Sequence, residues 1–116
     1  MPSYSKNEIV LVRYPFSDLT SAKVRPAVIV NAPHASQDVL IVPLTSKTGA
    51  LLAGEFVLAE WKGAGLNVET AVKRGIFTIQ EKLVLKSVGR LLTVDAEKLE
   101  NSLREWLGLH QGGRLR

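Results

Sequence analysis

Apolar residues occur in short runs along the first 94 positions of the chain, and polar segments rich in turn-forming residues separate these runs. β-Branched residues are frequent in the runs, a composition typical of strands. The pattern predicts roughly five to seven strands. They are expected at 8–14, at 26–31, at 38–44, at 55–59, once or twice within 70–79, and once within 83–92.

The segments 15–24, 32–37 and 45–53 are expected to be loops, because they are polar or contain proline and glycine. The run 26–31 is mostly apolar without alternation, which is typical of a buried strand. Pro43 lies within the third run and cannot donate a ladder hydrogen bond. We therefore expect that strand to lie at a sheet edge or to bulge at this proline.

The last part of the chain has helical spacing. After Asp95, which can cap a first turn, apolar residues recur at three- and four-residue intervals at Ala96, Leu99, Leu103 and Leu107. Gly108 is a suitable C-terminal stop, and 111–116 is expected to be a frayed tail. The pattern as a whole predicts a mainly β fold, a small barrel of short strands with one amphipathic C-terminal helix docked on it.

The bulk properties are typical of one small domain spanning residues 1–116. The net charge of +4 and the pI near 9.6 suit a polyanionic partner such as nucleic acid. Cysteine is absent, which excludes a disulfide framework and a thiolate zinc site. No apolar stretch reaches the ~18 residues of a membrane span, and the N-terminus has no apolar signal core. We expect a cytoplasmic protein.

Common catalytic constellations are missing from the sequence. It contains neither a P-loop nor a dinucleotide-binding fingerprint, so no cofactor is expected. His34 and His110 lie in a loop and in the tail, and neither has a second histidine or a cysteine at ligand spacing, so we expect no metal site. A Ser-His-Asp triad could form only around His34, and no nucleophile elbow supports it.

Polar residues next to predicted strands remain as candidates for chemistry. Arg25 directly precedes Pro26 and a buried strand, and its guanidinium could present a planar, permanently charged fork to a phosphate. Thr45 and Ser46 follow the third strand and bring two hydroxyls to one rim. The alternatives are an ion pair of Arg25 with a nearby carboxylate such as Asp18 and a simple strand-capping turn at the two hydroxyls. Four further cations could surround the same rim, namely Lys23, Lys47, Lys73 and Arg74.

The order of several segments is more informative than any one of them. N-E-I-V-L-V-R-Y-P-F-S-D-L-T (7–20), K-V-R-P-A-V-I-V (23–30) and V-L-I-V-P-L-T-S (39–46) occur in the order and at the spacing of the MazF/PemK toxin family, which the chain resembles. W-K-G-A-G-L (61–66), A-V-K-R-G-I-F-T-I (71–79) and the terminal helix resemble the PemK-like branch. The resemblance extends over residues 7–109.

This resemblance implies an SH3-like barrel that forms a homodimer and cleaves single-stranded RNA sequence-selectively, inhibited by an antitoxin encoded next to it. By position, Arg25 matches the family's catalytic arginine and Thr45 its catalytic threonine. Residues expected on the RNA-binding surface are Ser17, Asp18, Thr20, Lys23, Ser46, Lys47, Lys73 and Arg74. Either Lys73 or Arg74 can take the family's basic position, because the match needs a one-residue gap there.

The chain also departs from the family pattern. Some members carry a histidine or glutamate in the loop before R-P, where this chain offers only Asp18 as an ionisable acid. Others carry an aspartate after the later V-[RK], where this chain has none. The general acid and base therefore stay unassigned, with Asp18, His34 and Glu55 as candidate proton acceptors. Bases could stack on Phe16, Trp61 or Phe77, although each is more typical of a core.

Two other functions fit the same expected fold. One is a CcdB-like poison of DNA gyrase, in which Arg25 and Thr45 would be dispensable and residues of the terminal helix, notably Trp106, would be required. The other is a non-catalytic SH3-like module whose loops bind a peptide or RNA. Incubation of the pure protein with RNA separates both from a nuclease.

Overall fold

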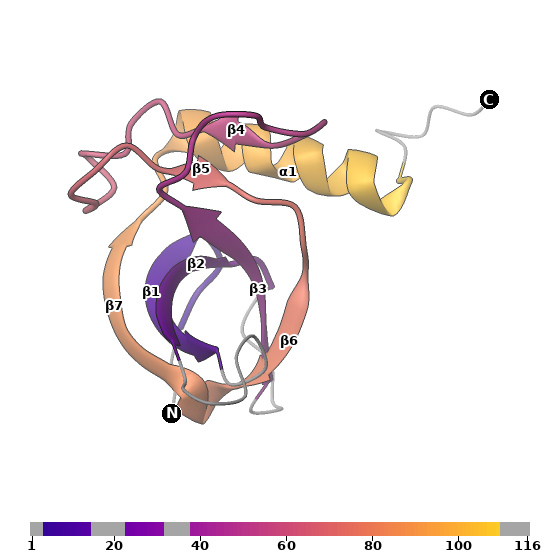
Figure 1. Ribbon diagram of the computed structural model, residues 1–116. Coiled ribbons are helices and arrows are strands. Elements are labelled where there is room, and N and C mark those ends of the chain that lie inside the picture. Colours follow the sequence, from indigo (N-terminus) through magenta and orange to yellow (C-terminus); the bar gives the residue numbers. More distant parts are fainter. Residues whose placement is uncertain (1–3, 15–22, 32–37, 110–116) are drawn as a thin grey trace.

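The computed structural model describes residues 4–14, 23–31 and 38–109 (Figure 1). Within these ranges the chain forms seven strands, a short 3-10 helix and one α-helix, in the order that the sequence predicts. Their bounds are β1 Glu8–Tyr14, β2 Lys23–Ile29, β3 Asp38–Thr45, β4 Phe56–Val57, β5 Ala71–Val72, β6 Phe77–Gln80, η1 Glu81–Leu83, β7 Val84–Arg90 and α1 Thr93–Leu107.

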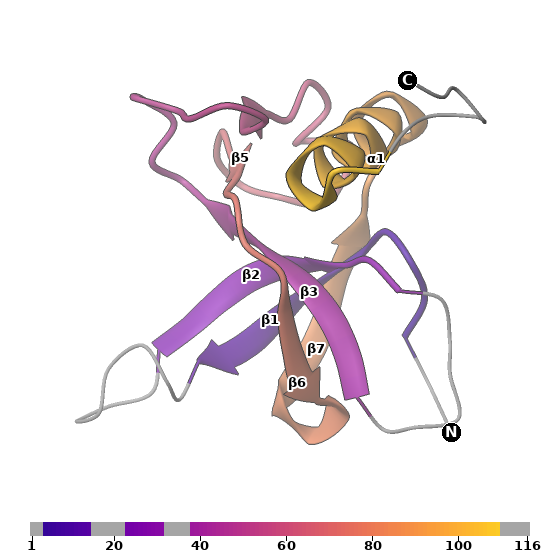
Figure 2. The same cartoon turned by 90° about the vertical axis from the view of Figure 1, so that its right-hand side faces the viewer.

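Strand β3 lies at the centre of an antiparallel sheet with the order β4-β5-β3-β2-β1-β7. On one side β3 pairs with β2. On its other side it pairs first with β6, from Asp38 to Ile41, and then with β5, at Leu44 and Thr45. Figure 1 shows the long strands curled around a common centre, and Figure 2 shows α1 and β5 above them. The predicted mainly β fold with a C-terminal helix is confirmed.

Pro43 lies inside the sheet and in regular register with β2, so neither the predicted edge position nor the alternative of a bulge at this proline is correct. It falls in the gap between the β6 ladder, which ends at Ile41, and the β5 ladder, which begins at Leu44. The Pro43 carbonyl accepts a hydrogen bond from the Lys73 amide at 2.9 Å on this side. In an antiparallel strand the N–H and C=O of one residue point the same way, so the missing donor of Pro43 faces the gap.

Strand β2 begins earlier than predicted and ends earlier as well. Lys23 and Arg25 belong to the strand and not to the preceding loop, and both pair with β1. The ladder between β2 and β3 covers only Ala27–Ile29. Among the described residues, the first half of β2, including Pro26, therefore has no strand partner on its β3 side, where a proline is tolerated.

Alternate residues of the strands face two hydrophobic clusters on opposite sides of the sheet. One cluster lies inside the curl of the strands and comprises Val10, Val12, Ala27, Ile29, Val39, Ile41, Ile79 and Val84. The other lies under α1 and comprises Ile9, Val28, Val42, Leu44, Leu58, Ala64, Val72, Leu91 and Leu99. Burial on both faces explains why the β2 and β3 runs are apolar without alternation.

Helix α1 starts at Thr93, two residues before the predicted cap, and ends before Gly108 as predicted. Gly108 adopts the left-handed conformation at φ 72°, typical of a helix C-cap. Asp95 does not cap the helix. Its fully buried carboxylate accepts hydrogen bonds from the amides of Ala59 and Glu60, at 2.8 and 2.9 Å, and so ties α1 to a distant loop. None of the described helices is long and apolar enough to cross a membrane.

Candidate functional site

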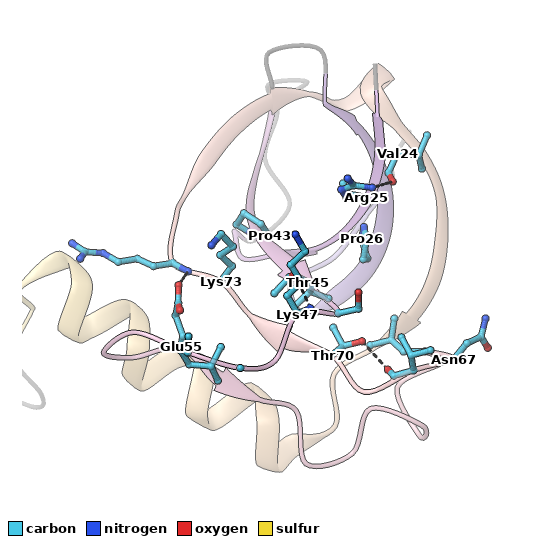
Figure 3. Close-up of a pocket in the computed structure, with 18 of the residues that line it drawn as sticks. Val24, Arg25, Pro26, Pro43, Thr45, Lys47, Glu55, Asn67, Thr70 and Lys73 are labelled. Carbon is cyan, nitrogen blue, oxygen red and sulfur yellow. Dashed lines mark hydrogen bonds between the residues drawn. The ribbon is translucent and has the colours of Figure 1, made fainter. Parts of the chain in front are cut away.

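A groove of about 910 Å³ opens where β2 and β3 cease to pair (Figure 3). Its walls come from the first half of β2, the end of β3 with the loop that follows, and the segments before and after β5. The polar and aromatic residues that line it include Arg25, Thr45, Ser46, Lys47, Glu55, Asn67, Thr70, Lys73, Arg74 and Phe77.

Strand register explains why the key residues meet. The β2–β3 ladder begins with Ala27 opposite Pro43, and the same register continued by two residues sets Arg25 opposite Thr45. On the other side of β3, the Lys73 amide is bound to the Pro43 carbonyl. Arg25 and Lys73 therefore flank the end of β3, with Thr45 between them, as Figure 3 shows.

Arg25 is exposed in the groove. Among the described residues it makes no ion pair, and its guanidinium donates only a long hydrogen bond of 3.5 Å to the neighbouring Val24 carbonyl. Asp18, the carboxylate that the alternative explanation required, lies outside the described residues. Because the permanently charged Arg25 guanidinium makes only this one long hydrogen bond among the described residues, its other donors can bind a phosphate.

Thr45 is the last residue of β3, and its hydroxyl is oriented by the backbone. Its Oγ1 accepts a hydrogen bond from the Lys47 amide at 3.0 Å, which forms a tight turn beyond the strand. A hydroxyl that accepts in this way keeps its proton for donation. The strand-capping turn therefore also orients the Thr45 hydroxyl. Ser46 and Lys47 are exposed beside it.

The basic segment Lys73–Arg74 forms the wall opposite Arg25, and both of its side chains are exposed. Glu55 lies beside it, and its Oε2 accepts a hydrogen bond from the Arg74 amide at 2.8 Å. Backbone hydrogen bonds from Arg74 and Leu52, together with the charges of Lys73 and Arg74, hold the pKa of the Glu55 carboxyl below its ordinary value. Glu55 is therefore ionised at neutral pH and weakly basic.

Two of the three candidate aromatic residues lie in the described part of the chain and differ in exposure. Phe77 lines the groove with 37% of its surface exposed, against the expectation of a core position. Trp61 is partly buried against the cluster under α1, as a core residue would be. Asn67 and Thr70 also line the groove. No pattern in the sequence distinguishes such isolated polar residues from ordinary turn residues.

Several expected site residues lie outside the described residues. These are Ser17, Asp18 and Thr20, together with Phe16, His34 and His110. The backbone of Lys23 is described as the first residue of β2, paired with Tyr14, but its side chain is not. In the ranges that the structure covers, no three histidine, cysteine, aspartate or glutamate side chains come together in a way that could hold a metal ion.

Comparison with known families gives one match that covers most of the chain. Residues 5–107 match the profile of the family described as PemK-like, MazF-like toxin of type II toxin-antitoxin system. Among curated proteins, no sequence matches the chain significantly.

Several solved structures share the fold of this chain, and three of them are compared with it. An endoribonuclease in complex with its cognate antitoxin, from Mycobacterial species, superimposes with a TM-score of 0.72 at 18% identity, covering 97% of this chain and 100% of that chain. The Mycobacterium tuberculosis toxin MazF-mt6 gives 0.72 at 22% identity, covering 90% and 99%. A MazE-MazF structure from Deinococcus radiodurans gives 0.72 at 14% identity, covering 95% and 100%. These likenesses establish the fold.

Proposed function

Because this chain belongs to the PemK-like, MazF-like toxin family of type II toxin–antitoxin systems, we propose that it is a cytoplasmic endoribonuclease that cuts single-stranded RNA at selected sequences without a metal ion. The observation that supports this most is the groove, which is lined by the Arg25 guanidinium, the oriented Thr45 hydroxyl and three further cations. Arg25 and Thr45 are the proposed catalytic residues. Ser46, Lys47, Lys73 and Arg74 are proposed to bind the RNA backbone.

RNA carries its own nucleophile, so the protein has little covalent chemistry to perform. The ribose 2′-oxygen forms a bond to the adjacent phosphorus as its proton leaves, the bond from phosphorus to the 5′-oxygen breaks, and that oxygen takes up a proton. The products are a 2′,3′-cyclic phosphate and a 5′-hydroxyl. Positioning and charge stabilisation supply most of the acceleration in such a reaction.

The two proposed catalytic residues suit different parts of this reaction. Arg25 is cationic at any working pH and can neutralise the negative charge that builds up on the phosphate, but it is a poor base for the same reason. The Thr45 hydroxyl can donate to a non-bridging oxygen, because the hydrogen bond that it accepts from the Lys47 amide leaves its own proton available. Glu55 is a weak candidate for the proton acceptor because its pKa is lowered.

We further propose that an acidic antitoxin segment binds over the groove and that the toxin acts as a homodimer. One solved structure of the same fold is described as an endoribonuclease in complex with its cognate antitoxin. The exposed cations Lys47, Lys73 and Arg74 would attract an acidic segment, which would order on binding.

The decisive experiment is incubation of the pure protein with single-stranded RNA in EDTA, followed by sequencing of the 5′ ends. We expect cleavage at a short motif, 5′-hydroxyl ends, and loss of cleavage when the product of the neighbouring antitoxin gene is added. RNA that stays intact would contradict the nuclease function and make a gyrase inhibition assay the next step. A neighbouring gene product that binds without changing the cleavage rate would contradict the antitoxin proposal.

A further inference from the structure

Glu55 stabilises the turn formed by residues 52–55, next to the groove, through two hydrogen bonds with Leu52. The Glu55 amide donates to the Leu52 carbonyl at 2.9 Å, and the Leu52 amide donates to Glu55 Oε1 at 2.8 Å. The second carboxylate oxygen, Oε2, is occupied by the Arg74 amide at 2.8 Å. The Glu55 side chain thus binds its own turn through Oε1. Through Oε2 it binds the Lys73–Arg74 segment that follows β5.

Helix α1 holds the same turn from behind. Ser102 donates from its hydroxyl to the Gly54 carbonyl at 2.7 Å, and the Trp106 indole N–H donates to the Ala53 carbonyl at 3.1 Å. Gly54 has a φ of +84°, and a Cβ built there would lie 2.4 Å from Trp106 Nε1. The turn is therefore pressed against the helix and cannot shift without losing these contacts.

The basic segment Lys73–Arg74 depends on two successive backbone hydrogen bonds. The Lys73 amide is held by the Pro43 carbonyl of β3, and the Arg74 amide is held by the carboxylate of Glu55. The first bond is provided by the sheet. The hydrogen bond of the Arg74 amide depends on the Glu55 side chain. The residue at position 55 therefore determines whether the Arg74 end of the segment is held in place.

We propose that Glu55 is a positioning residue that fixes the Lys73–Arg74 segment for contact with the RNA backbone, relaying the rigidity of α1 to the groove. This inference rests on the proposed function. Glu55 brings a negative charge into a groove that is to bind a polyanion, which by itself weakens RNA binding. The hydrogen bonds that it accepts explain why a carboxylate is useful there despite that cost.

The charge of Glu55 and its positioning role lead to different predictions for the RNA affinity of two variants. Glu55→Gln and Glu55→Ala remove the same negative charge, and loss of that charge alone should strengthen RNA binding in both variants. Glutamine keeps one oxygen that can accept a backbone hydrogen bond, whereas alanine keeps none. If Glu55 positions the segment, E55A should bind RNA more weakly than E55Q. The matched control is Glu97→Ala, because Glu97 is exposed on α1 and does not line the groove.

The experiment has a structural arm and a kinetic arm, both on the full chain, with thermal melts to confirm that each variant is folded. Amide hydrogen exchange followed by NMR should show the Arg74 amide exchanging at least tenfold faster in E55A than in wild type, and unchanged in E97A. In cleavage of a fluorogenic RNA, KM should be about tenfold higher for E55A than for E55Q, with kcat of both within about threefold of wild type. This split is expected because the segment contacts phosphates other than the reacting one.

Three results would overturn the positioning role. They are unchanged exchange of the Arg74 amide in E55A, equal KM values for the two variants, and a hundredfold loss of kcat in E55Q, which would identify Glu55 as the base. If wild-type protein leaves RNA intact, the proposed function fails and the comparison moves to binding of a 2′-O-methylated RNA oligonucleotide by fluorescence anisotropy. Weaker binding by E55A than by E55Q then supports the positioning role, and equal affinities or no binding overturn it.

Discussion

The guanidinium of Arg25 contributes little to folding, since it is exposed and makes one long hydrogen bond among the described residues. We expect Arg25→Ala to stay folded and to cleave RNA at least a hundredfold more slowly than wild type. Removal of one preorganised donor that stabilises developing charge costs roughly 3 kcal/mol. Initial cleavage rates, with a thermal melt on the same sample, check this prediction. A folded R25A that cuts as fast as wild type would exclude Arg25 from the chemistry.

Arg25→Lys is the matched control for charge. Lysine keeps the positive charge but lacks the planar pair of donors that fits two phosphate oxygens. We expect R25K to recover only part of the lost rate. Recovery to the wild-type rate would mean that charge alone is needed at this position.

Thr45 offers a neutral donor, so its removal should cost less than removal of the guanidinium. We expect Thr45→Ala to slow cleavage by about tenfold, which corresponds to roughly 1.4 kcal/mol. Thr45→Ser keeps the hydroxyl and its hydrogen bond from the Lys47 amide, and should stay within about threefold of wild type. Comparison of kcat for the two variants tests the role of the hydroxyl. Equal losses in T45A and T45S would assign the effect to the methyl group instead.

At the level of elements, β7 approaches closely the turn that contains Ala64, in the segment between β4 and β5. A Cβ built on Gly89 would lie 1.7 Å from the Ala64 carbonyl oxygen, which also accepts a hydrogen bond from the Arg90 amide. Gly89→Ala should therefore force the two backbones apart and lower the free energy of unfolding by about 2–4 kcal/mol. Urea unfolding measures this change. Gly49→Ala, where a Cβ meets nothing within 4 Å, should change it little.

The strands were predictable because burial on one or both faces leaves a direct pattern in the sequence. The edge position of Pro43 was predicted wrongly, because a break between two ladders on one side of a central strand looks the same in sequence as an edge. Asp95 was expected to cap its own helix, as acidic residues near helix starts often do. Its true partners, the amides of Ala59 and Glu60, are more than 30 residues away along the chain and leave no local signal.

Part of the candidate site follows from the same reasoning. Arg25 and Thr45 could be named as candidates because they adjoin recognisable strands, and their catalytic roles were predicted from the resemblance to the MazF/PemK family. The choice between Lys73 and Arg74 was ambiguous in sequence, and in the structure both line the groove. Glu55 appeared only as one possible base, because its bond to the backbone of Arg74 depends on how β4 and β5 pair.

At the scale of the whole molecule, stability depends on pH through two carboxyl groups in the part of the chain that the structure describes. The pKa of Glu55 is lowered, and so is that of Glu8, where burial raises the pKa but hydrogen bonds with Ser87 and Ser5 and the charge of Arg90 outweigh it. The stability that these groups contribute is present above their ordinary pKa of 4.5 and is lost as the pH falls through their lowered values. A double variant, E8Q with E55Q, should therefore have a lower free energy of unfolding than wild type at pH 7, and the difference should be much smaller at pH 3. An equal difference at both pH values would contradict this linkage.

We expect the chain to form a homodimer in solution. The sheet order ends at β4 and β7, and strands at the ends of a sheet leave backbone groups unpaired. Leu52, Leu107 and Leu109 are large apolar side chains that are each more than half exposed, and pairing with a second copy could cover them. Sedimentation at micromolar concentration should show a species of twice the chain mass. A single 12.7 kDa species would contradict the prediction.

The pairing of β1 with β7 has a consequence for how the chain folds while it is being synthesised. Glu8 lies opposite Arg90, so the ladder between β1 and β7 can form only after β7, the last described strand, has been synthesised. The turn at Ala53 and Gly54 waits longer still, because Ser102 and Trp106 of α1 hold it. A nuclease with the function proposed above would therefore become competent only after α1 has been synthesised and has folded onto this turn. The interval in which an antitoxin has to capture it begins at that point.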